Sequence, residues 1–105
     1  MSFTLRRVAA RAVVLSRDDH VLLLKARDPA DSSKGEWWEI PGGGIDPHES
    51  PAAAASREVY EETGLRSFEL GPEVATQKAE FTFAGIHFDQ FEHIHVAWAD
   101  DRREI

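Results

Sequence analysis

The stretch that decides the fold runs from Gly43 to Leu65 and reads GGIDPHESPAAAASREVYEETGL. Its centre predicts an α-helix over Pro51–Thr63. Ser50 stands at the N-cap position, a proline opens the first turn, and Gly64 suits the left-handed position after the last turn. Strand-like segments flank this helix on both sides. The chain therefore belongs to the α+β or mixed α/β class.

Three carboxylates gather on one face of the predicted helix. Glu58, Glu61 and Glu62 are spaced i, i+3 and i+4, and like charges at these spacings repel one another. Such a trio alone is typical of a solvated surface. A hard divalent cation such as Mg²⁺ or Mn²⁺ would remove the repulsion, because it prefers carboxylate oxygens. Glu49, just before the cap, adds a fourth carboxylate near the positive end of the helix.

The surrounding residues complete a longer pattern, G-x5-E-x7-R-E-U-x-E-E-x-G-U, where U is apolar. Every defined position is filled, by Gly43, Glu49, Arg57, Glu58, Val59, Glu61, Glu62, Gly64 and Leu65. This stretch resembles the Nudix box, and the preceding Trp38–Gly43 resembles the usual lead-in of the Nudix (MutT-like) hydrolase family.

The resemblance implies a fold and a metal site. The fold would be an α/β/α sandwich around a mixed sheet, formed by residues 1–105 as a single domain. The metal ligands would be Glu58, Glu61, Glu62 and the backbone carbonyl of Gly42, with Mg²⁺ as the cation or Mn²⁺ in its place. Arg57 would form an ion pair with Glu49 or Glu61 that holds these carboxylates, rather than a simple helix-surface pair.

The resemblance also implies a reaction, in which water attacks one phosphorus of a nucleoside diphosphate linked to a group X. Within the box, Glu58 is our first choice for the general base. Outside it, Glu80 and Glu92 are candidates, and we prefer Glu92 because its strand could run back toward the helix. The alternative is that Glu92 is only the solvent-facing member of an alternating strand.

The identity of X rests on elimination. Subfamily signatures for NADH, coenzyme A, ADP-ribose and dinucleoside polyphosphates are missing, and Gln77–Phe83 holds neither proline nor tyrosine. A nucleoside triphosphate is therefore the expected substrate. The alternatives are an ADP-ribose or nucleotide-sugar pyrophosphatase, or a Nudix domain that senses nucleotides without cleaving them.

The strands follow from apolar periodicity and turn residues. We expect strands over Arg6–Ser16, with Val8, Ala10, Ala12 and Val14 on one face, then over Val21–Lys25, Trp37–Ile40, Phe68–Gln77, Glu80–Ala84 and Ile86–Ala99. Phe83–Ile86 is the predicted hairpin turn. One helix cannot cover both faces of such a sheet. Either a second copy covers the other face, giving a homodimer, or the natural protein continues past Ile105 with a C-terminal helix that this chain lacks.

The composition limits the kinds of partner that this protein is expected to bind. The net charge is −7, from 12 basic and 19 acidic residues, which argues against a nucleic acid polymer but allows a small phosphate ligand carried by metal ions. The longest aliphatic run, Val21–Leu24, is too short to cross a membrane, and no signal peptide precedes the first strand. With no cysteine as well, we expect a cytoplasmic protein.

Several ring-bearing side chains have two interpretations. His87, His93 and His95 share one parity, so a zinc cluster is an alternative to surface or half-buried positions. Trp37 and Trp38 point to opposite sides of a strand; packing of both in the core is favoured over stacking of one on a base. Phe81 and Phe83 share a face and carry the same two alternatives.

Overall fold

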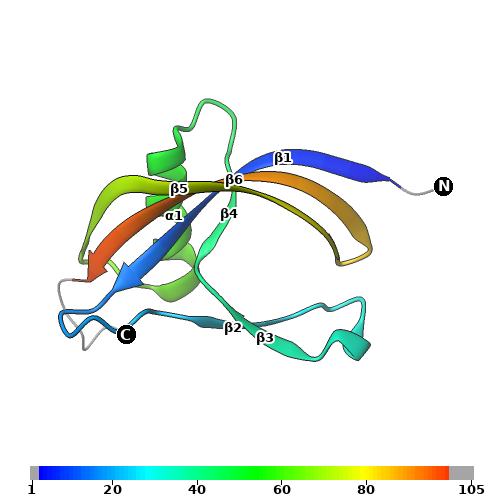
Figure 1. Ribbon diagram of the computed structural model, residues 1–105, viewed down its shortest axis with the longest axis horizontal. Coiled ribbons are helices and arrows are strands. Elements are labelled where there is room, and N and C mark those ends of the chain that lie inside the picture. The colour runs from blue at the N-terminus through cyan, green and yellow to red at the C-terminus, as the bar shows by residue number, and fades with distance from the viewer. Residues whose placement is uncertain (1–2, 100–105) are drawn as a thin grey trace.

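The computed structural model describes residues 3–99 and contains one α-helix and two sheets in that range (Figure 1). The elements in chain order are β1 (Thr4–Leu15), β2 (Leu24–Arg27), the 3-10 turn η1 (Ser32–Lys34), β3 (Glu36–Glu39), β4 (Gly42–Gly44), α1 (Pro51–Thr63), β5 (Phe68–Phe83) and β6 (Ile86–Ala99). Within these residues no helix is long and apolar enough to cross a bilayer.

The main sheet is mixed, with strand order β4-β1-β6-β5. β1 and β6 run parallel, with Ala10 opposite His93, whereas β4 and β5 pair antiparallel with their neighbours. β2 and β3 form a separate two-stranded sheet. A mixed sheet with one helix confirms the predicted fold class, and no second α-helix is seen within residues 3–99.

Helix α1 forms as its sequence predicts. The Ser50 hydroxyl accepts a hydrogen bond from the Ala53 amide at 3.1 Å, and Gly64 adopts a left-handed conformation with φ 74°. The helix packs against one face of the main sheet, where small side chains on both elements allow close approach. The fully buried residues at this contact are Ala10, Ala12, Val14, Ala54, Ala55, Val59 and Leu65.

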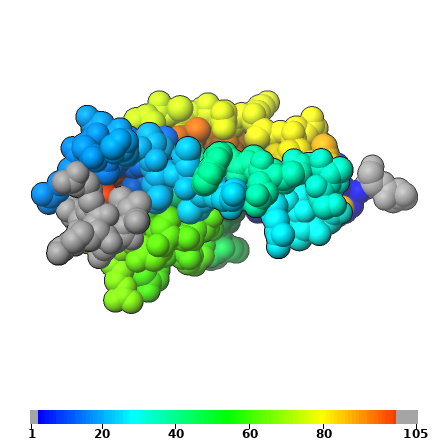
Figure 2. Space-filling view, turned by 90° about the horizontal axis from the view of Figure 1, so that it is seen from below, coloured from blue at the N-terminus to red at the C-terminus, as the bar shows by residue number. Residues whose placement is uncertain are grey.

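The β2–β3 sheet lies opposite the other face of the main sheet, at the lower edge of Figure 1. Seen from that side, it crosses the front of the molecule, with β5 above it and α1 below (Figure 2). Hydrogen bonds tie it to the main sheet at both ends: Ala12 N–H donates to the Pro41 carbonyl, and Ala84 N–H donates to the Asp28 carboxylate. The face that we expected to be uncovered therefore has this small sheet opposite it.

Three strand predictions were wrong in detail. The segment from Val21 to Leu23 is not a strand, because the chain leaves β1 through a turn, and β2 begins only at Leu24. The two strands predicted after the helix are one strand, β5, whose irregularities around Glu73 let it continue past Pro72. β4 was missed because its three glycines carry no side-chain pattern.

The predicted hairpin turn is confirmed between β5 and β6. Ala84 and Gly85 both have positive φ angles, 53° and 80°, which is the geometry of a two-residue hairpin turn.

Candidate active site

Arg57 organises the loop that leads into α1. Its guanidinium binds both oxygens of Glu49, at 2.8 and 2.9 Å, and donates to the Gly44 carbonyl at 3.0 Å. Hydrogen bonding to Arg57 lowers the pKa of Glu49 to about 2, and the same pairing raises the pKa of Arg57 further above its ordinary range. The ion pair predicted between Arg57 and Glu49 is thus present, and it fixes the helix against β4.

Two of the helix carboxylates reach the glycines of β4. The Gly42 amide donates to Glu62 Oε1 at 2.8 Å. A Cβ atom at Gly43 would stand 2.6 Å from Glu58 Oε1, so any other residue there would force that carboxylate to shift. Partial burial raises the pKa of Glu62 to about 7, and the neighbouring Glu58 adds to the rise while the Gly42 amide opposes it.

Glu61 is oriented differently. It is about half exposed and contacts Arg57 Nη1 at 3.3 Å, and the same Arg57 nitrogen donates to Glu58 at 3.0 Å. Within residues 3–99, no group of three His, Asp or Glu side chains converges as metal ligands would. Of the predicted ligands, the structure brings Glu58, Glu62 and Gly42 together, whereas Glu61 points to Arg57.

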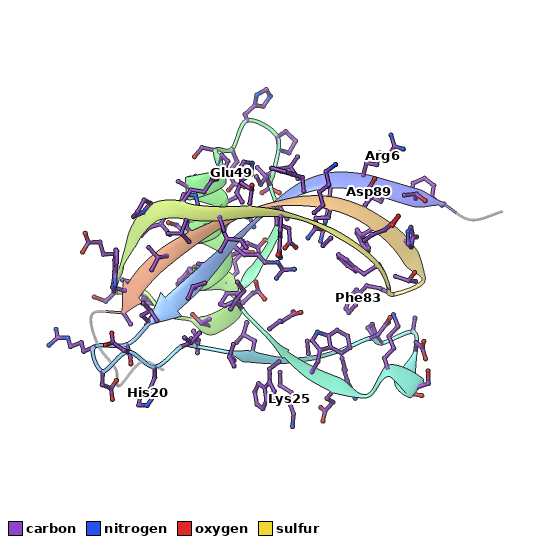
Figure 3. The ribbon with its side chains drawn as sticks, viewed as in Figure 1. Arg6, His20, Lys25, Glu49, Phe83 and Asp89 are labelled. Atoms are coloured by element: carbon purple, nitrogen blue, oxygen red, sulfur yellow. The ribbon has the colours of Figure 1, made fainter. Side chains whose placement is uncertain are left out.

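A cleft of about 710 Å³ separates the main sheet from the β2–β3 sheet. Gly42, whose amide binds Glu62, is one of the residues that line it. Its walls combine cationic, acidic and aromatic side chains, namely Arg7, Arg11, Lys34, Trp37, Glu39, Gln77, Phe81, Phe83 and Glu92. Phe83 points from the end of β5 toward the small sheet (Figure 3). The prediction that Phe81 and Phe83 share a face is confirmed, and both line the cleft.

Glu92 lies in this cleft but is almost fully buried, with a relative exposure of 2%. Arg11 Nε donates to its Oε2 at 2.8 Å, Gln77 donates to its Oε1 at 2.7 Å, and Gln90 donates to its Oε2. Burial opposes ionisation, but these hydrogen bonds outweigh it and lower the pKa of Glu92. The alternative that Glu92 faces solvent is wrong.

The other ring-bearing and acidic candidates lie elsewhere. His93 pairs with Glu73, His95 bonds to the Gly71 carbonyl, and His87 contacts Glu80 and Thr82, so the three histidines have separate partners and form no zinc cluster among the described residues. Glu80 is exposed and lies between the cleft-lining residues Ala79 and Phe81 in β5, so it points to the opposite face.

The prediction that both tryptophans pack in the core was wrong. Trp38 is 62% exposed, and Trp37 lines the cleft, donates to Glu39 at 3.0 Å and meets Phe83 edge-on at a centroid distance of 6.4 Å.

Sequence reasoning missed the cationic wall of the cleft. Arg7 and Arg11 occupy β1 at the parity opposite to Ala10, Ala12 and Val14, which pack on α1. The alternation of β1 could have placed both arginines on the second face. It could not show that β2 and β3 enclose that face.

Comparison with known proteins agrees with this arrangement. The sequence profile of the NUDIX domain matches residues 5–105. The chain belongs to the NUDIX family. A diphosphoinositol polyphosphate phosphohydrolase 2 from Rattus norvegicus is 39% identical over 61 residues, which are 58% of this chain and 31% of that protein. An RNA pyrophosphohydrolase from Bartonella quintana is 54% identical over 41 residues, 39% of this chain and 24% of that protein.

A solved Nudix-type structure supports the fold. The crystal structure of a C. elegans Ap4A hydrolase superimposes with a TM-score of 0.69 at 22% identity, covering 94% of this chain and 72% of that one. The chain thus spans most of that structure but less than a third of the length of the two curated relatives it matches.

Proposed function

We propose that this Nudix chain is a hydrolase, dependent on Mg²⁺ or Mn²⁺, that cleaves the P–O–P linkage of a nucleoside diphosphate joined to a group X. One observation carries the proposal: Glu58 and Glu62 meet at the glycines of β4, and one of these glycines, Gly42, lines a cleft with cationic and aromatic walls. The cleft has a volume of about 710 Å³, within the range of small-molecule sites.

The residues at β4 fit a hard divalent cation. They supply oxygen donors only, from Glu58, Glu62 and the Gly42 carbonyl, and the close approach of Glu58 to Gly43 leaves the carboxylate against backbone. Glu61 would join them by leaving Arg57, which retains Glu49 as its partner. A bound cation would polarise phosphate oxygens and lower the pKa of a water molecule.

The remaining roles belong to the chain's own side chains. We assign Glu58 as the general base that takes the proton of the attacking water, and Arg57 as the residue that orients the box carboxylates. Glu92 was our preferred base outside the box. Its two oxygens already accept three hydrogen bonds, which supports a positioning role for Glu92 on Arg11 rather than proton transfer.

The substrate panel follows from the relatives. A nucleoside triphosphate remains our first choice, with ADP-ribose and nucleotide sugars next. The relatives' names add a diphosphoinositol polyphosphate and an RNA. Including the RNA tests the prediction that no nucleic acid polymer is a partner. The predicted homodimer and the predicted cytoplasmic location stay predictions.

The test is product analysis by ³¹P NMR over this panel, with Mg²⁺ and with chelator. We expect turnover of at least one substrate with Mg²⁺, loss of turnover in Glu58→Gln, and unchanged turnover in Glu69→Gln, a matched exposed carboxylate on β5. Absence of turnover by the folded wild-type chain would contradict the proposal. Nucleotide binding without hydrolysis, unchanged by Glu61→Gln, would instead favour the sensing domain.

A further inference from the structure

Arg7 differs from the other cations that line the cleft. Arg11 is paired with Glu92 at 2.8 Å and Lys34 with Asp28 at 2.9 Å. Within residues 3–99, no carboxylate lies within ion-pair distance of Arg7, although its pKa responds to Glu58 and Glu92 at longer range. The guanidinium of Arg7 is thus a positive charge in the cleft wall without a direct counter-ion in the described part of the chain.

Neutral contacts hold this guanidinium in place. Its Nε donates to the side-chain oxygen of the buried Gln90, and its Cζ lies 4.6 Å from the centroid of the Phe88 ring. On the other side it lies against β4, where a Cβ atom at Gly44 would be 3.2 Å from Nη1. An arginine that is fixed through Nε and through the flat face of its guanidinium keeps its Nη hydrogens for another acceptor. It also loses little side-chain entropy when it binds that acceptor.

The surroundings make an unpaired charge costly. Burial and the neighbouring Arg11 both lower the pKa of Arg7. An anion that enters the cleft would offset both effects. Phosphate suits this position, because guanidinium donates two parallel hydrogen bonds to phosphate oxygens. Moreover, Arg7 lies against Gly44 and Glu58 against Gly43, and consecutive strand residues face opposite sides, so the cation and the acidic site flank the edge strand β4 from its two faces.

We propose that Arg7 is a specificity-determining residue that binds a phosphate group of the substrate in the cleft, across the edge strand β4 from the phosphate held at Glu58 and Glu62. That the anion bound by Arg7 is a phosphate of the substrate rests on the proposed function. The substrate favoured by this arrangement carries a further phosphate, as a nucleoside triphosphate does, rather than a diphosphate esterified at both ends as in ADP-ribose.

The test compares Arg7→Gln with Arg6→Gln. Both remove one positive charge from neighbouring residues of β1, but the Arg6 side chain is 85% exposed and forms a 3.7 Å surface pair with Asp89 (Figure 3). The probe is methylenediphosphonate, an uncleavable diphosphate analogue, titrated calorimetrically in Mg²⁺. We expect roughly 10- to 100-fold weaker binding for Arg7→Gln and less than about twofold change for Arg6→Gln. Equal affinities in the two variants would overturn the proposal.

Two further measurements separate binding from structure. Arg7→Lys keeps the charge but loses the planar guanidinium that lies over the Phe88 ring, so we expect about 3- to 10-fold weaker binding. This variant decides the matter if Arg7→Gln does not fold, and wild-type affinity in it would then overturn the proposal. Mn²⁺ affinity, measured by electron paramagnetic resonance, should be unchanged in Arg7→Lys; a parallel loss of Mn²⁺ binding would indicate a structural role and also overturn it.

Hydrolysis assays distinguish this proposal from the proposed function. In an active chain, Arg7→Gln should raise KM for the triphosphate more than KM for ADP-ribose. If Arg7→Gln hydrolyses the substrates with unchanged KM values and binds the analogue unchanged, the proposed role of Arg7 is wrong and the proposed function stands. If analogue binding depends on Arg7 but the chain hydrolyses no substrate, the proposed function is wrong and the role of Arg7 stands.

Discussion

Replacing Glu92 by glutamine tests whether the floor of the cleft depends on a buried ion pair. Glu92 pairs with Arg11, and their side chains are 2% and 17% exposed, respectively. Glu92 also accepts three hydrogen bonds in all. Removing one partner of a buried pair costs about 3–5 kcal/mol. Arg11 keeps some solvent and its bond to the Ile40 carbonyl, and glutamine keeps one acceptor oxygen, so we expect about 2–3 kcal/mol.

For a domain of this size, that loss lowers the melting temperature by about 10–15 °C, measured by differential scanning calorimetry at neutral pH. The folded-state pKa of Glu92 is lowered, so its stabilisation is present at neutral pH and is lost as the pH falls through that pKa. The gap between wild type and Glu92→Gln should therefore narrow in acid.

A double-mutant cycle isolates the pair. Adding Arg11→Gln to Glu92→Gln should cost less than the sum of the single changes, with a coupling of about 1–2 kcal/mol. Glu69→Gln, an exposed carboxylate on β5, should shift stability by less than about 0.5 kcal/mol. A Glu92→Gln melting temperature within about 2 °C of wild type, or additive effects of the two single changes, would show that the Arg11–Glu92 pair does not stabilise the fold.

Three further predictions concern the elements around the cleft. Gly43→Ala places a Cβ 2.6 Å from Glu58 Oε1 and should lower kcat/KM roughly 10- to 100-fold in steady-state assays; wild-type kinetics would show that the close contact is unimportant. Glu49, with a pKa of about 2 against an ordinary 4.5, contributes stability above that ordinary value, and this is lost as the pH falls toward 2. Glu49→Gln should therefore flatten the acid side of the melting-temperature profile, and an unchanged profile would count against the pairing with Arg57. Asp28→Asn removes the carboxylate that binds Lys34 and the Ala84 amide, so we expect a lower melting temperature and faster hydrogen exchange at Ala84; unchanged protection there would argue against this tie between the sheets.

The parts of the fold that local chemistry specifies could be predicted from the sequence. The bounds of α1 match because Ser50 and Gly64 act on backbone groups a few residues away. The turn at Ala84-Gly85 is likewise local. β4 escaped prediction because it depends on pairing with β1, which is distant in the sequence, and the continuity of β5 escaped it because that depends on pairing with β6 rather than on an apolar pattern within β5.

The candidate site divides in the same way. The acidic half, with Glu58, Glu62 and Arg57, lies in one contiguous motif and could be found by spacing. The cleft half is assembled from β1, β3, β5 and β6, and no short motif marks Arg7 or Trp37. The orientation of Glu61 toward Arg57 is a choice between rotamers that spacing alone does not determine.

The measurement that tests the account most directly is Mg²⁺-dependent hydrolysis of a nucleoside triphosphate in H₂¹⁸O, with products followed by ³¹P NMR and mass spectrometry. We predict one ¹⁸O atom in a phosphate product per cleavage, no reaction in chelator, and loss of reaction in Glu58→Gln but not in Glu69→Gln. Turnover that persists unchanged in Glu58→Gln, or in chelator, would contradict the assignment of the chemistry to the carboxylates at β4.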